Sequence, residues 1–224
     1  MQRRQFLGKA ALTGLAATMP VSGFAADTAG LPNLAAKAVP IGKAERMARI
    51  ARATELMRAN DIGALLVEPG SSLIYFTGVE WWRSERLTAA VLTREGEVAI
   101  VTPFFEEPSV RESLGIEAEV LMWNEDENPL AAVAAWLGKR GLAKGRIGVE
   151  ETVRYFAVDG LQRVMPGATV VNGAPVVRGC RMHKSAAEIA LMQIAADITI
   201  AAYRHTAPRM ISSNSLCPPT SARS

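Results

Sequence analysis

The chain has 224 residues, of which 49% are hydrophobic, enough for one well-packed domain with extensions. Its formal net charge is +3, and residues 1–25 account for it because they contain three basic residues and no acidic one. The rest of the chain is therefore neutral overall and lacks the clustered lysines and arginines of a nucleic-acid surface, so we expect no nucleic-acid partner. Two cysteines, Cys180 and Cys217, exclude a disulfide framework and a cysteine-based zinc site, and whether they pair stays open.

The first 25 residues have the order of an export signal. Arg3 and Arg4 precede an apolar run, residues 10–21, which is too short to span a bilayer. Gly23 and Ala25 then place small side chains on either side of Phe24, the small-x-small pattern of a signal-peptidase site with cleavage after Ala25. The pattern resembles a twin-arginine signal, so we expect a periplasmic protein without a stable membrane anchor.

Helical and strand patterns alternate from residue 41. Residues 26–40, with small side chains and two prolines, predict a linker to this region. The spacing of apolar residues predicts a helix over 43–59. This helix is expected to bury Met47, Ile50, Thr54 and Met57 and to turn Arg46, Arg49, Arg52 and Arg58 mostly towards water.

Short apolar runs bounded by Gly, Pro and Asn predict the strands. They cover residues 62–68, 72–77, 87–93, 97–102, 117–123, 146–149 and 168–171. Gly96 in the turn after 87–93 favours a hairpin. Helices are predicted after Pro108, after a cap at Asn128, and over 153–164, where Val153, Phe156, Leu161 and Val164 form one face. The alternation predicts an α/β domain over residues 41–177, a mixed β-sheet flanked by helices.

A long helix is predicted to begin at Ser185. Ser185 and Glu188 have the spacing of a capping box, and no Gly or Pro follows until Pro208. The apolar face is wider than one stripe and has no evident cover, so we expect dimerisation, fraying or poor solubility. Residues 205–224 are rich in Ser, Pro and Thr without an acidic residue, and they predict a disordered tail.

The loop at residues 78–86 carries the most unusual composition. Trp81, Trp82 and Arg83 lie together there, and Trp and Arg are enriched in binding hot spots. One interpretation is a contact surface. The other is that one tryptophan covers a sheet edge while Arg83 or Arg86 pairs with Glu85, and for Arg86 this pairing is favoured.

The chain contains no recognisable catalytic motif. Its two histidines, His183 and His205, have no metal-ligand spacing, and the patterns of serine hydrolases and nucleotide-binding loops do not occur. Glu150 and Glu151 are interpreted as charges before a helix N-terminus rather than as an acid/base pair. The acidic run at residues 125–127 is interpreted as a solvated loop rather than a cation site.

Several segments together resemble the creatinase, prolidase and Xaa-Pro aminopeptidase family. They are Leu73 to Gly78, Glu85 to Leu87, Pro103 to Glu106, Ile147 to Glu150 and Arg181 to Ala196. The resemblance extends over about residues 45–205. It implies that residues 178–204 are the junction and first helix of a C-terminal domain, preceded by an N-terminal α/β domain.

In that family two divalent metal ions (Mn, Co or Zn) are bound in the C-terminal metallopeptidase domain. The ligand pattern, two Asp, one His and two Glu, is missing here, so we expect no catalytic or metal-binding residue and a chain cut short by truncation or frameshift. The resemblance implies a non-catalytic N-terminal domain of an exported Xaa-Pro aminopeptidase- or prolidase-like enzyme. It places Trp81, Trp82 and Arg83 in substrate or subunit contact, with a second copy or the catalytic domain as partner.

Two other functions stay open. One is a stand-alone periplasmic binding module that docks a partner through the Trp81–Trp82 loop and the exposed face of the helix over 185–203. The other is a fragment of a creatinase-like amidinohydrolase acting on small guanidino compounds. The export signal favours the peptidase relation over the amidinohydrolase.

Overall fold

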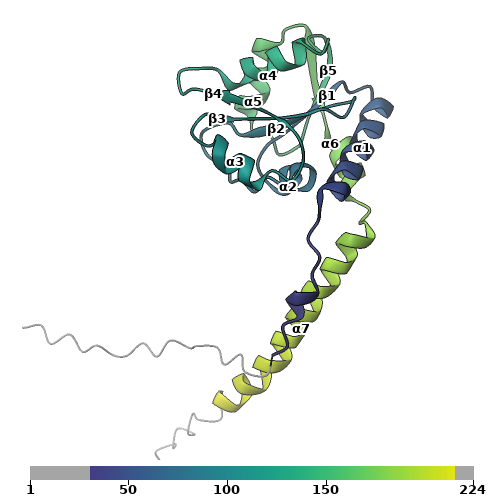
Figure 1. The fold of residues 1–224 in the computed structure, drawn as a ribbon, viewed down its shortest axis with the longest axis vertical. Helices are drawn as coiled ribbons and strands as arrows, with labels where there is room; N and C mark the ends of the chain where they lie inside the picture. Colours follow the sequence, from purple (N-terminus) through teal and green to yellow (C-terminus); the bar gives the residue numbers. More distant parts are fainter. Residues whose placement is uncertain (1–30, 215–224) are drawn as a thin grey trace, which may run out of the picture. The chain divides into compact units, whose positions relative to one another are not determined.

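The structure is a computed structural model that describes residues 31–214 (Figure 1). The predicted export signal, including Arg3 and Arg4, and the second cysteine, Cys217, lie outside the described residues. Residues 34–199 form one compact unit, whereas residues 200–214 belong to a second one. The sheet, its flanking helices and the candidate site all belong to the first unit.

Six strands and seven α-helices, with a short 3₁₀ turn, make up the described chain. In order they are η1 (Leu34–Lys37), α1 (Lys43–Ala59), β1 (Ala64–Val67), α2 (Ser71–Thr77), β2 (Ala89–Thr93), β3 (Val98–Pro103), α3 (Glu107–Ser113), β4 (Glu119–Trp123), α4 (Pro129–Gly138), β5 (Gly145–Val149), α5 (Tyr155–Val164), β6 (Ala168–Asn172), α6 (Ala174–Arg181) and α7 (Ala186–Asn214).

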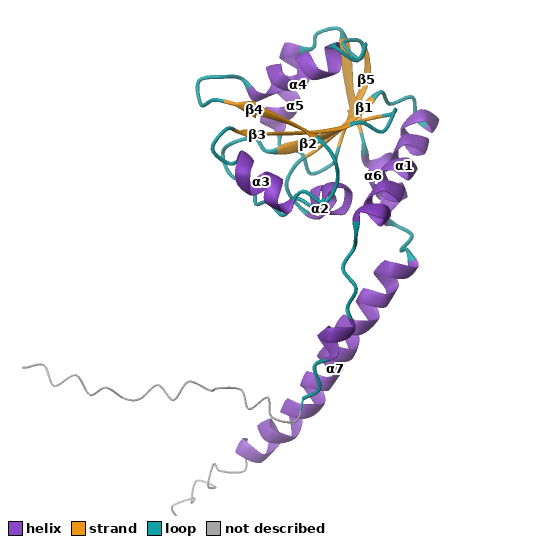
Figure 2. Cartoon of the chain, viewed as in Figure 1, coloured by secondary structure: helices purple, strands orange, loops and turns teal. Residues whose placement is uncertain are grey.

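The strands form one mixed sheet in the order β4-β3-β2-β1-β5-β6 (Figure 2). β2 pairs antiparallel with β1 and β3, and the remaining neighbours are parallel. The predicted hairpin is confirmed: β2 and β3 are joined through Gly96, whose φ of 93° lies in the left-handed region that glycine adopts without strain. The predicted α/β class with a mixed sheet is therefore confirmed.

Helices cover both faces of the sheet. Because side chains alternate along a strand, Ala64 and Leu66 of β1 face one layer and Leu65 and Val67 face the other. The first layer holds α4 and α5, and the second holds α1, α2, α3 and α6. Two buried clusters, one on each face, supply the hydrophobic stabilisation of the domain.

The predicted strand at residues 72–77 is wrong, because α2 occupies this position. Its β-branched and aromatic residues favour a strand locally. In the structure both neighbours of β1 are already taken by β2 and β5, so this segment has no strand beside β1 to pair with. It instead turns Leu73 and Phe76 into the core at helical spacing and ends at Gly78, which has a φ of 85°.

Helix α1 is confirmed, but two of its side chains lie opposite to the prediction. Met47 is 42% exposed, whereas Arg49 is only 8% exposed. Ile50, Thr54 and Met57 are buried as predicted, and Ala53 joins them on the inner face. Arg49 sits on the same face because carbonyl and carboxylate partners receive its guanidinium there.

Two further differences concern the last third of the domain. Phe156 is 43% exposed rather than buried, and the Arg154 guanidinium lies 4.6 Å from its ring centroid. Helix α6 was not predicted, yet Val176, Val177 and Cys180 of this helix belong to the core. The packed structure therefore continues through residue 181.

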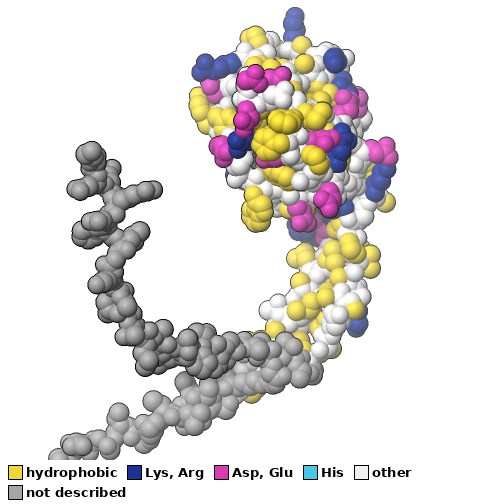
Figure 3. All heavy atoms as spheres, turned by 60° about the vertical axis from the view of Figure 1, so that its left-hand side comes forward, with side chains coloured by type: hydrophobic (Ala, Val, Ile, Leu, Met, Phe, Trp, Pro, Cys, Tyr) yellow, Lys and Arg dark blue, Asp and Glu magenta, His cyan; other side chains and the backbone are white. Residues whose placement is uncertain are grey.

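Helix α7 begins with the predicted capping box. The Ser185 amide donates to Glu188 Oε2 at 2.9 Å, and the Glu188 amide donates to Ser185 Oγ at 3.2 Å. The helix continues beyond Pro208 to Asn214, so residues 205–214 are helical where the sequence predicted a disordered tail. Uncharged and hydrophobic side chains predominate along it (Figure 3). By length and hydropathy alone, Ala186–Pro208 is long enough to cross a bilayer, a criterion that apolar helices of soluble proteins also meet.

Candidate functional site

A cleft of about 970 Å³ lies where the parallel strands β1 and β5 end. In open α/β sheets, the crevice outside the carboxyl ends of neighbouring strands is the usual place for a ligand. Its walls come from α2, the loop at residues 80–83, the segment after β5, and α6. The lining includes Ser71, Ile74, Glu80, Trp81, Trp82, Arg83, Glu150, Glu151, Thr152, Arg178, Arg181 and Met182.

The structure brings all three predicted contact residues to this cleft. Trp82 is 90% exposed, whereas Trp81 is partly buried and packs against the core. Arg83 Nε donates to the Pro69 carbonyl at 3.1 Å, and Arg83 Nη2 donates to Thr152 Oγ1 at 2.7 Å. The two tryptophans thus differ: Trp81 covers part of the core, and Trp82 presents its indole at the rim.

A polar network crosses the floor of the cleft. Arg181 donates from Nη1 to Ser72 Oγ at 2.9 Å and from Nη2 to Ser71 Oγ at 2.8 Å. Ser72 Oγ in turn donates to Glu150 Oε1, and the Glu150 residue is buried. This network joins α2, the end of β5 and the end of α6, and sequence spacing gave no sign of it.

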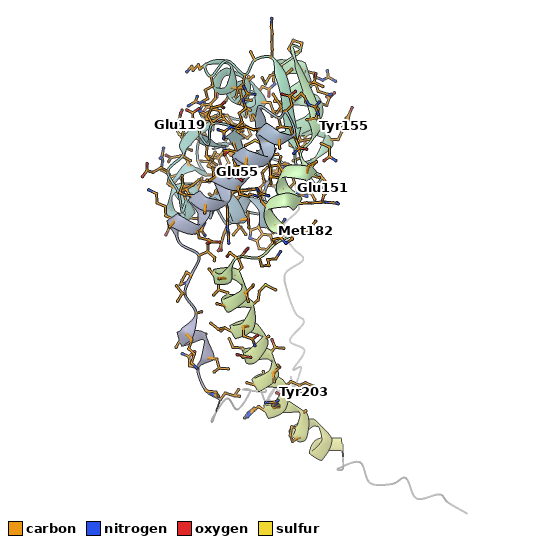
Figure 4. The ribbon with its side chains drawn as sticks, turned by 90° about the vertical axis from the view of Figure 1, so that its right-hand side faces the viewer. Glu55, Glu119, Glu151, Tyr155, Met182 and Tyr203 are labelled. Carbon is orange, nitrogen blue, oxygen red and sulfur yellow. The ribbon has the colours of Figure 1, made fainter. Side chains whose placement is uncertain are left out.

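Glu150 and Glu151 serve different purposes, and the interpretation of both as helix N-terminal charges is wrong. Helix α5 begins at Tyr155, beyond their reach as capping charges. Glu151 points to α6, where Arg178 Nη2 lies 2.5 Å from its Oε2, while Glu150 turns inward to Ser72. Figure 4 shows Glu151 on the same side of the domain as Met182, the residue that follows α6. Adjacent residues that diverge in this way do not form an acid/base pair.

A second buried carboxylate, Glu68, holds the rim of the cleft. Arg154 donates to its Oε1 from Nε at 2.9 Å and from Nη2 at 2.7 Å, and the Arg154 amide donates to Oε2 at 2.7 Å. The same guanidinium also donates to the Ser84 carbonyl, in the loop that carries Trp82. An acidic residue directly after the apolar strand run was the one sequence sign of this pair.

Arg86 forms the ion pair favoured by the sequence, and a further one. It contacts Glu85, and its Nη2 lies 2.6 Å from Glu125 Oε1. The interpretation of residues 125–127 as a solvated loop is confirmed, because all three residues are exposed. Glu125 in addition pairs with Arg86 while 62% of its side chain stays exposed. These groups lie outside the cleft.

The described residues do not fit a dinuclear metal centre. Across residues 31–214, no group of three His, Cys, Asp or Glu side chains is arranged to bind a metal ion. Burial also raises the pKa of the Cys180 thiol to about 11, which keeps it protonated at neutral pH and unsuited to nucleophilic attack. The buried Cys180 thiol is therefore not assigned a nucleophilic role.

Comparison with protein families matches residues 49–183, more than half of the chain, to the creatinase/prolidase N-terminal domain. An uncharacterized peptidase of Schizosaccharomyces pombe is 31% identical over 192 residues, which are 80% of this chain and 41% of that protein. The probable dipeptidase PepE of Mycobacterium tuberculosis is 29% identical over 143 residues, 63% of this chain and 37% of PepE. The chain spans about two fifths of the length of these relatives.

Solved structures share the fold. Dipeptidase PepE from Mycobacterium ulcerans superimposes with a TM-score of 0.59 at 25% identity, over 75% of this chain and 51% of that one. The N-terminal domain of Xaa-Pro dipeptidase from Lactobacillus brevis matches over 60% of this chain and 99% of its own, with a TM-score of 0.54 and 15% identity. From the family match and the shared six-stranded fold, the chain belongs to the creatinase/prolidase N-terminal domain family.

Proposed function

We propose that this chain is the non-catalytic N-terminal part of an exported prolidase- or Xaa-Pro aminopeptidase-like metallopeptidase. Its cleft shapes substrate access where the domain meets a second subunit or the catalytic domain. Relatives named as peptidase, dipeptidase and prolidase favour a peptidase over an amidinohydrolase.

The observation that carries this proposal is the rim of the cleft. Trp82 leaves 90% of its surface in water, a large apolar area without cover in the described structure. Hydrogen bonds from Arg83 hold the same loop to Pro69 and Thr152. Arg154 donates both to the Ser84 carbonyl of the loop and to Glu68. A large aromatic side chain on a pre-organised loop is typical of a contact hot spot, because little conformational entropy is lost when it is covered.

In this proposal the cleft orients the substrate, and a separate catalytic domain carries out hydrolysis. Two divalent metal ions and the residues that activate water belong, in this proposal, to a catalytic domain outside the described residues. The cleft contributes apolar surface and arginine side chains that orient a substrate or a neighbouring subunit. Residues 1–25 direct the protein to the periplasm, a role supported by Arg3 and Arg4 ahead of the apolar run.

The non-catalytic part of the proposal is tested with the purified full chain. We expect no hydrolysis of Xaa-Pro dipeptides above the protein-free control, with Mn²⁺ or Co²⁺ added. Metal-dependent turnover that persists after further purification contradicts this part of the proposal.

The access role is tested in a hybrid in which residues 31–184 of this chain replace the matching region of Mycobacterium tuberculosis PepE. We expect Trp82→Ala to lower kcat/KM by about tenfold, the scale of a hot-spot truncation, without a shift in the thermal midpoint. The matched control is Phe104→Ala, which removes an aromatic side chain that is 53% exposed and lies outside the cleft. Equal effects of the two substitutions, or none from Trp82→Ala, contradict the access role.

A further inference from the structure

Arg49 is the most unexpected side chain of the domain. It lies on α1, where the sequence predicted contact with water, yet only 8% of the residue is exposed. A buried guanidinium is stable only when its charge and its N–H groups are met by partners. The partners of Arg49 come from three different helices.

The first contact reaches α2. Arg49 Nη1 donates to the Tyr75 carbonyl oxygen at 3.0 Å, and the guanidinium carbon lies 4.1 Å from the centroid of the Tyr75 ring. Tyr75 is itself fixed from the other side, because its hydroxyl donates to the Cys180 carbonyl of α6 at 3.0 Å. Arg49 therefore contacts the middle of α2 through both the backbone and a ring.

The second contact reaches the start of α7. Arg49 Nη2 lies 3.3 Å from Glu188 Oε1, whose partner oxygen Oε2 accepts the Ser185 amide of the capping box. A third, longer contact joins Arg49 Nε to Glu45 Oε1 within α1, at 3.5 Å. One carboxylate, that of Glu188, thus serves both the cap of α7 and the buried guanidinium.

Helix α2 is also a wall of the cleft, through Ser71 and Ile74. The segment between α6 and α7 is attached to this helix at both ends: Arg181 donates to Ser71 and Ser72, and Glu188 reaches α2 by way of Arg49. We propose that Arg49 is a positioning residue that couples the first turn of α7 to the cleft wall formed by α2. The coupling does not depend on what enters the cleft.

The physical reason is the sharing of one buried charge. When Glu188 loses its charge, the Arg49 guanidinium keeps Glu45, whose Oε1 lies 3.5 Å from Nε, as its one anionic partner, and it shifts towards Glu45 or towards water. Its hydrogen bond to Tyr75 and its place over the ring change with it. A substitution in the first turn of α7 therefore changes the contacts, and with them the amide-exchange rates, of α2.

The test compares Glu188→Gln with Ser185→Ala in the full chain by hydrogen–deuterium exchange. Ser185→Ala removes one capping hydrogen bond and Glu188→Gln removes the negative charge near the helix N-terminus, so both should speed amide exchange in the first turns of α7. Only Glu188→Gln removes an anionic partner of Arg49, so only this variant should speed exchange at residues 72–77 of α2, by about tenfold or more. Unchanged exchange in α2 for Glu188→Gln, or an equal increase for Ser185→Ala, overturns the proposal.

Substitutions of Arg49 itself distinguish coupling from general support of the fold. Arg49→Met should reproduce the faster exchange of α2, and Arg49→Lys should restore part of the protection because it keeps the charge. In the double variant Arg49→Met/Glu188→Gln, exchange of α2 should be no faster than in Arg49→Met alone. Additive effects overturn the coupling. If Arg49→Met does not fold, the comparison of α2 exchange in Glu188→Gln and Ser185→Ala by itself supports or overturns the coupling.

Discussion

At the scale of single residues, buried charges organise the surroundings of the cleft. Glu68 is fully buried and Glu150 nearly so, and each lies directly after a strand that borders the cleft. Each is satisfied by a group from elsewhere in the chain, Arg154 for Glu68 and Ser72 for Glu150. A buried ion pair adds little net stability, because taking its charges out of water costs about as much as their attraction returns. Removing one partner is nevertheless costly, because the remaining charge is then buried without compensation.

We expect Arg154→Met to lower the free energy of unfolding by about 3–5 kcal/mol, because it leaves the Glu68 carboxylate without its ionic partner. The matched control is Arg163→Met, which removes an exposed pair with Asp159 within α5 and should change stability by less than about 1 kcal/mol. Urea denaturation of both variants measures the difference. Equal losses in the two variants would show that burial of Glu68 does not set the penalty.

At the scale of elements, α2 shows where local sequence and tertiary context disagree. The segment has strand-forming residues, but it becomes a helix that supplies a cleft wall and receives Arg49. Its end depends on Gly78, where a β-carbon would lie 2.9 Å from Arg46 Nε and 3.0 Å from the Gly115 amide nitrogen. The turn after α2 is thus closed both by backbone conformation and by packing.

We expect Gly78→Ala to destabilise the domain by about 1–3 kcal/mol, the range for a non-glycine residue forced into the left-handed region. Gly138→Ala is the control: it lies at the end of α4, has ordinary φ, and a β-carbon there meets nothing within 4 Å. That variant should be neutral or more stable by up to about 1 kcal/mol, because alanine restricts the unfolded chain. Denaturant unfolding of both variants measures these free-energy changes. An unchanged free energy of unfolding in Gly78→Ala would contradict the prediction.

At the scale of the whole molecule, the chain combines a packed domain with terminal segments of different character. The domain buries two clusters, one on each face of the sheet, whereas α7 exposes Ile189, Met192 and Tyr203. That α7 dimerises or binds another protein through its apolar face therefore remains a prediction. If the proposed export signal acts as we expect, α7 would bind such a partner in the periplasm.

We expect the full chain, expressed in a Gram-negative host with a twin-arginine pathway, to appear in the periplasm and to be cut after Ala25. Arg3→Lys together with Arg4→Lys should abolish export, because that pathway reads the arginine pair. Arg52→Lys, a conservative change at an exposed position of α1, should not affect it. Fractionation with mass spectrometry of the N-terminus measures both outcomes, and export of the Lys-Lys variant would exclude the twin-arginine route.

The sequence alone determined the features that depend on neighbours along the chain. Caps at Asn128 and Ser185, the hairpin turn at Gly96 and the alternation of strands and helices were all predictable, because each is set by residues a few positions apart. Their order was enough to give the α/β class and the family resemblance.

Tertiary structure alone decided the features that join distant segments. The helical state of residues 71–77, the burial of Arg49, and the meeting of Trp82 with Arg181 at one cleft depend on contacts across tens of residues. Local propensity carries no information about such contacts. A charged side chain is buried only where the rest of the fold brings it a partner, and that partner is identified only when the packing is known.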